Sequence, residues 1–220
     1  MNDFHRSSLA DKGFYRYHLG VKLGKLLFLL GLVLVLSSCL STETSISVSA
    51  SGAGEIRYEY TISADAVYLG VFDRDSSILT IPVHRSDFET MARLSEDLEL
   101  RSYAMSERDG RVRVVADLSF TSIDGFNAAY NRGRDSLILE GTESSGSARL
   151  RIFDGFGEPV DRTFQEFASQ TAESLAYSLR LPGPVVSTNH GEYSGRTASV
   201  RFSIEELLET TEPVDWIVTW

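Results

Sequence analysis

The residue with the most distinctive chemistry in this 220-residue chain is Cys39, the only cysteine. A single thiol can carry a covalent lipid, but it cannot form a disulfide within its own chain. Cys39 directly follows Leu36, Ser37 and Ser38, at the end of the hydrophobic run Leu26–Leu36. Small residues of this kind are what a signal peptidase requires before its cleavage point. The surroundings of Cys39 therefore indicate an exported protein that is processed at this position.

The segment before Cys39 has the three parts of a secretory signal. Its first part carries five Lys or Arg residues against two acidic residues, and an eleven-residue apolar run follows. A membrane-spanning helix needs about 20 apolar residues, so this run is too short to span a bilayer. We therefore interpret residues 1–38 as a signal peptide.

The order Leu36-Ser37-Ser38-Cys39 resembles the lipobox of bacterial lipoprotein precursors. That resemblance implies cleavage just before Cys39 and a diacylglyceryl group on its sulfur, with palmitate expected among the acyl chains. Two acyl chains give stable membrane attachment. Residues 39–45 then form a lipidated tether, and the domain lies in the cell envelope outside the cytoplasm. Leu40 replaces the aspartate that marks inner-membrane retention in such lipoproteins, which favours the outer membrane in a host that has one.

No pattern in the remaining sequence indicates catalysis. His84 and His190 are far apart and form no metal-binding spacing with a cysteine or with each other. The G-x-S-x-G and S-x-x-K patterns of serine nucleophiles are absent after Cys39. The sequence therefore predicts a protein that is not an enzyme and that needs no metal or cofactor.

The charge changes sharply at Cys39. After it the chain has 16 arginines, no lysine and 29 acidic residues, a formal charge of −13. Nucleic acid requires a basic surface, so we expect no nucleic-acid partner. Anionic lipid headgroups would repel such a domain, so membrane attachment should depend on the lipid at Cys39. A basic protein is the partner that this charge favours.

The periodicity after residue 45 predicts one α+β domain over residues 46–220. Alternating apolar residues indicate strands, beginning with a hairpin whose second strand is Ile56–Ile62. Arg108-Asp109-Gly110 is expected to be a hairpin turn, and Asp215–Thr219 a final strand. We expect an antiparallel sheet with about three helices packed on one face.

The three expected helices carry phenylalanines 38 residues apart, at Phe88, Phe126 and Phe164. Each helix precedes two strands, so the order could be a helix–strand–strand repeat or a chance periodicity. Apolar residues on these helices either belong to an ordinary core or line a groove for an acyl chain. The candidates for such a groove are Phe88, Met91, Phe126, Tyr130, Phe164 and Phe167.

One segment suggests a family. Leu181-Pro182-Gly183 is followed by Val185 and Asn189, and then by a strand and a closing strand that contains tryptophan. This order, together with the lipobox, resembles the LppM-like domain of bacterial lipoproteins. The resemblance implies an α+β envelope domain that binds lipid or glycolipid and has no known enzymatic activity. The motif itself is expected to be structural, as a sharp turn between two extended segments.

Three functions remain open at this stage. The first is a non-catalytic lipoprotein that binds a lipid or glycolipid, or that organises the envelope. The second is a protein-interaction module in which the acidic surface meets a basic partner. The third, with the least support, is a hydrolase of envelope polymers that uses an acidic pair.

Replacement of Cys39 by alanine should abolish lipid attachment, because the thiol is the atom that is acylated. Metabolic labelling with a radioactive or clickable palmitate, followed by gel analysis, measures this directly. The unsubstituted chain should be labelled and should run as the shorter, processed form. Labelling that persists in Cys39→Ala would contradict the lipobox interpretation.

Overall fold

The computed structural model describes residues 41–68, 82–131, 136–155 and 174–220. Contacts divide the chain into Met1–Ser37 and a compact unit, Ser38–Trp220, and all described residues belong to the second unit. The predicted signal peptide, 1–38, and Cys39 lie outside the described residues, and so do Phe164 and Phe167.

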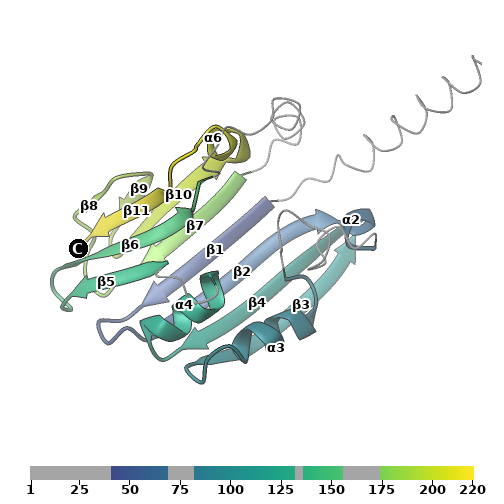
Figure 1. Ribbon diagram of the computed structural model, residues 1–220, viewed down its shortest axis with the longest axis horizontal. Coiled ribbons are helices and arrows are strands. Elements are labelled where there is room, and N and C mark those ends of the chain that lie inside the picture. Colours follow the sequence, from purple (N-terminus) through teal and green to yellow (C-terminus); the bar gives the residue numbers. More distant parts are fainter. Residues whose placement is uncertain (1–40, 69–81, 132–135, 156–173) are drawn as a thin grey trace, which may run out of the picture. The chain divides into compact units, whose positions relative to one another are not determined.

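The larger of two β-sheets has seven strands in the order β3-β4-β2-β1-β7-β10-β9 (Figure 1). Every neighbouring pair in this sheet is antiparallel except β1 and β7, which run parallel. Its strands are β1 (Ser41–Val48), β2 (Gly54–Ser63), β3 (Leu98–Arg108), β4 (Arg111–Phe120), β7 (Ser174–Arg180), β9 (Glu192–Ser194) and β10 (Thr197–Ser203).

The smaller sheet has four strands in the order β5-β6-β11-β8, all paired antiparallel. These are β5 (Leu137–Gly141), β6 (Gly146–Phe153), β8 (Ser187–Thr188) and β11 (Val214–Thr219). Four short helices accompany the sheets in the described part of the chain. They are α2 (Ala64–Tyr68), α3 (Arg85–Ala92), α4 (Ile123–Asn131) and α6 (Ile204–Leu208).

The predicted fold class is therefore wrong. The described chain is mostly β, with two sheets in place of one antiparallel sheet covered by three helices. Alternating apolar residues identify strands, but they do not show which strands are neighbours. The hairpin β3–β4 belongs to the larger sheet, and the hairpin β5–β6 belongs to the smaller one (Figure 1). The first two of the three expected helix–strand–strand units therefore do not occupy equivalent positions in the fold.

The first strand also begins earlier than expected. β1 starts at Ser41, inside the 39–45 stretch predicted to be a tether. Thr44, Ile46 and Val48 are buried at alternate positions of β1, and the strand pairs with β2 along its whole length. This pairing includes the serine- and threonine-rich residues that composition alone assigns to a tether.

The β3–β4 hairpin confirms the predicted turn. Asp109 and Gly110 both have positive φ, 53° and 70°. Positive φ at both central residues is typical of a type I′ turn, whose twist matches that of the paired strands. Ten residues of β4 then pair with β2 without a break in register, from Arg111 to Phe120.

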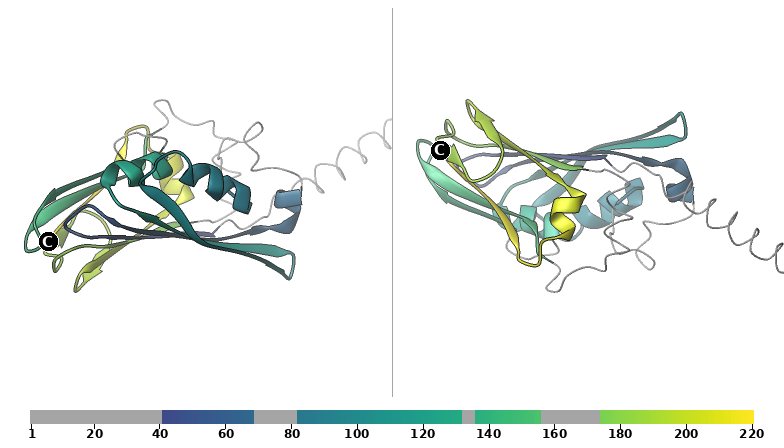
Figure 2. Two further views of the ribbon diagram at one scale, coloured as in Figure 1. Left: turned by 90° about the horizontal axis from the view of Figure 1, so that it is seen from below. Right: turned by 90° about the horizontal axis from the view of Figure 1, so that it is seen from above.

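One continuous core joins the two sheets. Inward residues of the larger sheet, such as Ile46 and Leu179, belong to the same buried cluster as Leu150 and Trp216 of the smaller sheet. Helices α3 and α4 lie on this inner side of the larger sheet (Figure 2), and α3 contributes the fully buried Phe88. The opposite, outer face of the larger sheet is polar, because inward and outward residues alternate along each strand.

Tyrosines form a distinct part of this core. Desolvation raises the pKa of Tyr58 and Tyr60 above the ordinary value of 10.0. Burial also raises the pKa of Tyr130 well above that value, and a hydrogen bond with Tyr177 adds to the effect. The Tyr60 side chain is only 4% exposed, and its hydroxyl has no hydrogen-bond partner among the described residues. Ionisation of these phenols is therefore disfavoured in the folded core.

The fold should therefore lose stability in alkali. A raised folded-state pKa gives stability that is complete below the unfolded value near pH 10 and is lost as the pH rises above it. Each such tyrosine contributes a slope of about 1.4 kcal/mol per pH unit in that range. Urea unfolding between about pH 9 and pH 12, with tyrosinate absorbance recorded in parallel, measures the effect.

Tyr60→Phe should unfold less steeply with pH, because it removes a buried hydroxyl that lacks a partner in the described structure. Tyr193→Phe is the matched control, since Tyr193 is 49% exposed and should not change the slope. Equal slopes for all three proteins would contradict the role of the buried phenols.

Candidate functional site: a hydroxyl-lined trough

The outer face of the larger sheet carries a row of three serines. Ser45 of β1 pairs with Ser178 of β7, and Ser178 pairs with Ser199 of β10. Residues directly opposite each other on neighbouring strands have Cβ atoms about 4.5–5.5 Å apart and face the same side. Three small hydroxyl side chains therefore lie next to one another on adjacent central strands.

The next row across the same strands is Ser47, Arg180 and Thr197. The hydroxyl residues of both rows are half-buried although no strand or helix of the described chain covers this face. Their side chains are short, so they lie lower than Arg180 between them and lower than the Arg and Glu side chains around them. We call the floor formed by Ser45, Ser47, Ser178, Thr197 and Ser199 the hydroxyl trough.

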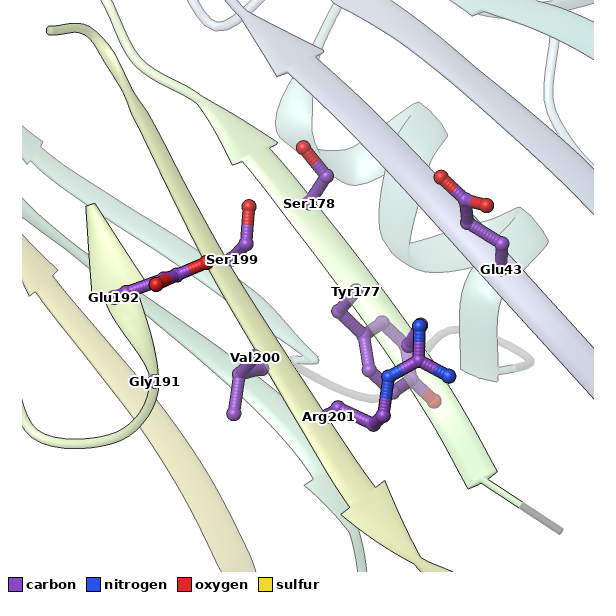
Figure 3. A pocket seen from close by; sticks show the side chains of 9 residues that line it. Glu43, Tyr177, Ser178, Gly191, Glu192, Ser199, Val200 and Arg201 are labelled. Atoms are coloured by element: carbon purple, nitrogen blue, oxygen red, sulfur yellow. The ribbon is translucent and has the colours of Figure 1, made fainter. Parts of the chain in front are cut away.

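Two hollows follow the trough and share Ser178. One has a volume of about 550 Å³ and is bordered by Glu43, Glu192 and Arg201 (Figure 3). In Figure 3 the Ser178, Ser199 and Glu43 side chains stand on the near side of the sheet, and the Tyr177 ring lies behind β7. The second hollow has a volume of about 590 Å³. Its charged lining residues are Arg57, Arg101, Arg180, Glu55 and Asp117.

Ion pairs hold the charged side chains beside the second hollow. The Nη1 of Arg57 donates to both carboxylate oxygens of Asp117, at 2.9 and 3.2 Å. Ser102 donates to the same carboxylate at 2.6 Å, and Glu59 accepts two hydrogen bonds from Arg113. The arginines are about half exposed and the carboxylates of Glu59 and Asp117 are 33% exposed, so solvent screens each pair and it contributes little to stability. Their effect is to limit the orientation of the guanidinium groups at the surface.

The side chains that line the trough can form hydrogen bonds with a polar ligand. The hydroxyls both donate and accept, the arginines donate, and the carboxylates accept. No histidine is among the residues that line either hollow. Within the described ranges, no group of three or more metal-ligating side chains comes together. Such a surface suits a ligand with several hydroxyl or anionic oxygens.

The apolar residues predicted to line a groove are located elsewhere. Phe88 and Phe126 are 0% exposed, and both belong to the core. Phe126 stacks on Tyr130 with ring centroids 5.2 Å apart, and Phe88 lies 5.7 Å from the Tyr103 ring. Met91 and Tyr130 are partly buried against the same core. None of these residues borders either hollow of the trough.

The Leu181–Asn189 segment crosses from one sheet to the other. It leaves the larger sheet after β7 and enters the smaller one as β8. The Val185 N–H donates to the Gly195 carbonyl beside β10, and the Val186 N–H donates to Thr219 of β11. Leu181 and Val185 are buried in the core. The segment therefore links the two sheets through its backbone as well as through its side chains.

Asn189 and Gly183 each have a specific place in this segment. The Asn189 amide accepts from the Ile217 N–H at 2.8 Å and donates to the Asp215 carbonyl at 2.9 Å, so it acts like a neighbouring strand. A Cβ on Gly183 would be 2.5 Å from Cδ1 of Trp220 and 2.8 Å from the Glu143 carbonyl. Pro182 lies between the buried Leu181 and this close contact.

Neither a known protein family nor a curated protein matches this chain by sequence. Among solved structures, the folded domain of LppM from Mycobacterium tuberculosis, determined by NMR, is similar to it with a TM-score of 0.41. The two are 12% identical, and the similarity covers 82% of this chain and 88% of the LppM domain. LppM gives its name to the family that the segment Leu181–Asn189 resembles. No functional conclusion follows from a likeness this distant.

Sequence reasoning did not identify the trough. Its residues are serines and threonines, of which Ser45 fell in the predicted tether while Ser178 and Ser199 fell in predicted strands, with nothing to indicate that they lie side by side. The available signal was Ser45 and Ser47 alternating with Ile46 and Val48, which indicates a strand with a polar outer face. The position of Ser45 beside Ser178 follows from the parallel pairing of β1 and β7, which the sequence does not indicate.

Gly183→Ala should destabilise the domain by about 1–3 kcal/mol, the usual cost of overpacking. The Trp220 ring cannot easily move away, because it is buried and its Nε1 donates to the Thr142 carbonyl at 3.0 Å. Chemical denaturation followed by tryptophan fluorescence measures the change. Val186→Ala in the same segment is the control, since Val186 is 67% exposed and should change stability by less than about 0.5 kcal/mol. If Gly183→Ala is as stable as the unsubstituted chain, the Trp220 ring moves to accommodate the added methyl group.

Proposed function

We propose that this chain is an envelope lipoprotein, anchored through diacylglyceryl-Cys39, whose β domain binds a polar envelope ligand without catalysis. The signal-like segment 1–38 and the lipobox-like sequence before Cys39 support the anchor. Among the residues that the structure describes, no helix has the length and hydrophobicity of a membrane span. The outer membrane is the proposed location in a host that has one, because Leu40 follows the cysteine.

The observation that carries the binding role is the hydroxyl trough. Five Ser and Thr side chains form its floor, the exposed Arg180 stands between Ser47 and Thr197, and other Arg and Glu side chains stand at its borders. The ligand that fits is the polar headgroup of a lipid or glycolipid, with many oxygens and little apolar surface. The acyl chain is not proposed to enter between the sheet and helices α3 and α4, because Phe88 and Phe126 are fully buried there as part of the core.

A protein partner is the second candidate, and the charge of −13 after Cys39 favours it. Binding to a basic protein through such a surface should weaken as salt is added, because salt screens exposed charges. Capture of a partner that does not depend on ionic strength would count against this alternative. No arrangement in the trough supports the hydrolase hypothesis.

Ser178→Trp should abolish ligand binding, because the large ring would fill the point that the two hollows share. Ser106→Trp is the matched control. Ser106 is exposed on the outer face of β3, outside the residues that line the trough. Both positions lie on the surface, so both variants should remain folded by circular dichroism.

The measurement is mass spectrometry of lipids that co-purify with the full chain, extracted from its own envelope in mild detergent. The unsubstituted chain and Ser106→Trp should retain a polar-headed lipid in excess of the bulk composition, and Ser178→Trp should not. Retention by Ser178→Trp would place the ligand elsewhere. An unsubstituted chain that retains nothing would contradict the proposed binding role.

A further inference from the structure

We propose that the open edge of β3 pairs antiparallel with the same edge of a second copy of this chain, with Met105 on the two-fold axis. This inference does not depend on the ligand proposed for the trough. β3 is the outermost strand at one end of the larger sheet (Figure 1). Its half next to the turn, Ala104–Arg108, is exposed at every position. An outermost strand of this kind presents unpaired backbone groups, to which another strand can add.

The backbone groups on this open edge are those of Tyr103, Met105 and Glu107. Arg108 and Arg111 flank the two-residue turn, and residues in that position exchange both of their hydrogen bonds. The direction of bonding alternates along a strand, so every second residue back from Glu107 has its N–H and C=O groups pointing away from β4. The described residues offer the backbone groups of these three residues no hydrogen-bond partner.

The exposed edges of the smaller sheet are closed in another way. At β5, the Asn127 side chain accepts from the Leu137 N–H at 2.7 Å and donates to the Leu137 carbonyl at 3.1 Å. Asn189 makes an equivalent pair of bonds with β11. β9, at the other end of the larger sheet, has only three residues. Among the described strands, β3 therefore has the longest edge that neither a strand nor a side-chain amide pairs with.

The register centred on Met105 uses all three edge residues at once. It places Met105 opposite Met105 of the second copy, and Tyr103 opposite Glu107 in both directions. Each of these pairs can exchange two backbone hydrogen bonds across the edge. The same register places Ala104 opposite Ser106. None of these pairs brings like charges directly opposite each other, an arrangement that would destabilise the strand pair.

Neighbouring registers fit less well. A register centred on Glu107 places the two copies of this glutamate opposite each other, and one centred on Tyr103 places Glu99 opposite Glu107. Like charges in these positions are destabilising. The two intermediate registers place one of the three edge residues opposite the turn or opposite the β-bulge at Arg101, a residue with no partner in β4. The edge therefore favours one symmetric pairing.

Met105 supplies an apolar contact at the centre of this pairing. Its partner in β4 is the buried Val114, so Met105 faces the core side of the sheet, yet it is 48% exposed. A residue on a two-fold axis meets its own copy. The two flexible methionine side chains would pack against each other and lose contact with water.

The charged side chains on the outer face are complementary in the same register. Arg108 of the second copy lies beside Ser102, whose hydroxyl donates to Asp117 at 2.6 Å. An exposed arginine thus comes close to a carboxylate that is held in place. Arg101 in turn comes next to Asp109 of the second copy. The charges at the two ends of the paired segment therefore attract each other across the edge.

Antiparallel pairing has a consequence for the trough. The two-fold axis is perpendicular to the sheet, so the outer faces of both copies lie on the same side. The pair would present two troughs on one continuous outer face.

The register-specific test is disulfide formation between two variants of the full chain, Ala104→Cys and Ser106→Cys. In the proposed pairing their Cα atoms lie about 4.5 Å apart, a spacing that a disulfide can bridge. Within either variant alone, the two cysteines would be diagonal neighbours about 7–8 Å apart, beyond the reach of a disulfide. A mixture of the two, purified in non-ionic detergent and then oxidised, should give a dimer on a non-reducing gel. Neither variant alone should do so, and the unsubstituted chain measures any cross-link that Cys39 forms.

Substitutions of Met105 test the edge by sedimentation of the full chain in density-matched detergent. Met105→Pro removes an N–H that has no partner in the described chain, so it should abolish association while β3 stays in the sheet. Met105→Thr keeps the N–H and a strand-forming side chain, and should still dimerise.

A charge at the same position gives a second, independent variant. Met105→Lys places two like charges opposite each other on the axis and should weaken association about tenfold. Val186→Lys is the matched control. Val186 is 67% exposed on the segment between the sheets, so association should stay within about twofold of the unsubstituted chain. If Met105→Pro does not fold by circular dichroism, Met105→Lys decides, since it leaves the backbone unchanged.

A mixture of folded Ala104→Cys and Ser106→Cys chains that forms no disulfide overturns the inference. So does an unsubstituted chain that is monomeric at every concentration. Association that Met105→Lys leaves unchanged has the same meaning, because two lipid anchors can share one detergent micelle without any contact at β3. None of these outcomes affects the binding role of the trough, which lipid retention tests.

Discussion

The parallel pairing of β1 with β7 is the interaction on which the rest of the domain depends. It joins the antiparallel group β3-β4-β2-β1 to the group β7-β10-β9 and makes one sheet of them (Figure 1). Strands that run parallel cannot be joined by a tight turn, so a long stretch of chain must separate them. That stretch contains the hairpin β5–β6, two of the strands of the second sheet. The pairing also aligns Ser45 with Ser178, and without it the trough would have no floor.

The Leu181–Asn189 segment solves the problem that this topology creates. Two sheets that share a core need a connection whose backbone groups are paired while it passes between them. Val185 and Val186 donate to Gly195 and Thr219, one beside each sheet. The Asn189 side chain accepts a backbone hydrogen bond from β11 that a neighbouring strand would otherwise accept. Gly183 has no side chain, so the chain can pass close to the Trp220 ring. The segment whose sequence suggested a family, Leu181–Asn189, is thus a structural link between the two sheets.

Local features were predictable from the sequence because local physics determines them. The turn at Asp109-Gly110 needs residues that tolerate positive φ, and the terminal strand Asp215–Thr219 alternates as a strand should. The start of α4 is local in the same way, because the Ser122 hydroxyl accepts from the Gly125 N–H three residues on. Such signals depend on neighbours a few residues apart.

The fold class and the trough were not predictable, because both depend on strands that are far apart in the sequence. Nothing near Ser45 indicates that β7 will lie beside it, or that it will run parallel. Likewise, the β5–β6 hairpin resembles β3–β4 in pattern but pairs with β11 in another sheet. The β-bulge in β3, where Arg101 has no partner in β4, is not indicated by the sequence either, since the residues on both sides of it have an ordinary strand pattern.

The position of β1 also gives the proposed anchor a physical consequence. β1 begins two residues after Cys39, and two extended residues span at most about 7 Å. An acylated Cys39 would therefore hold a central strand of the sheet close to the bilayer by a very short connection. Glu43 comes early in β1, whereas Ser47, beside Arg180, comes at its far end. The acidic end of the trough is thus nearer to the anchor along the chain than the arginine end.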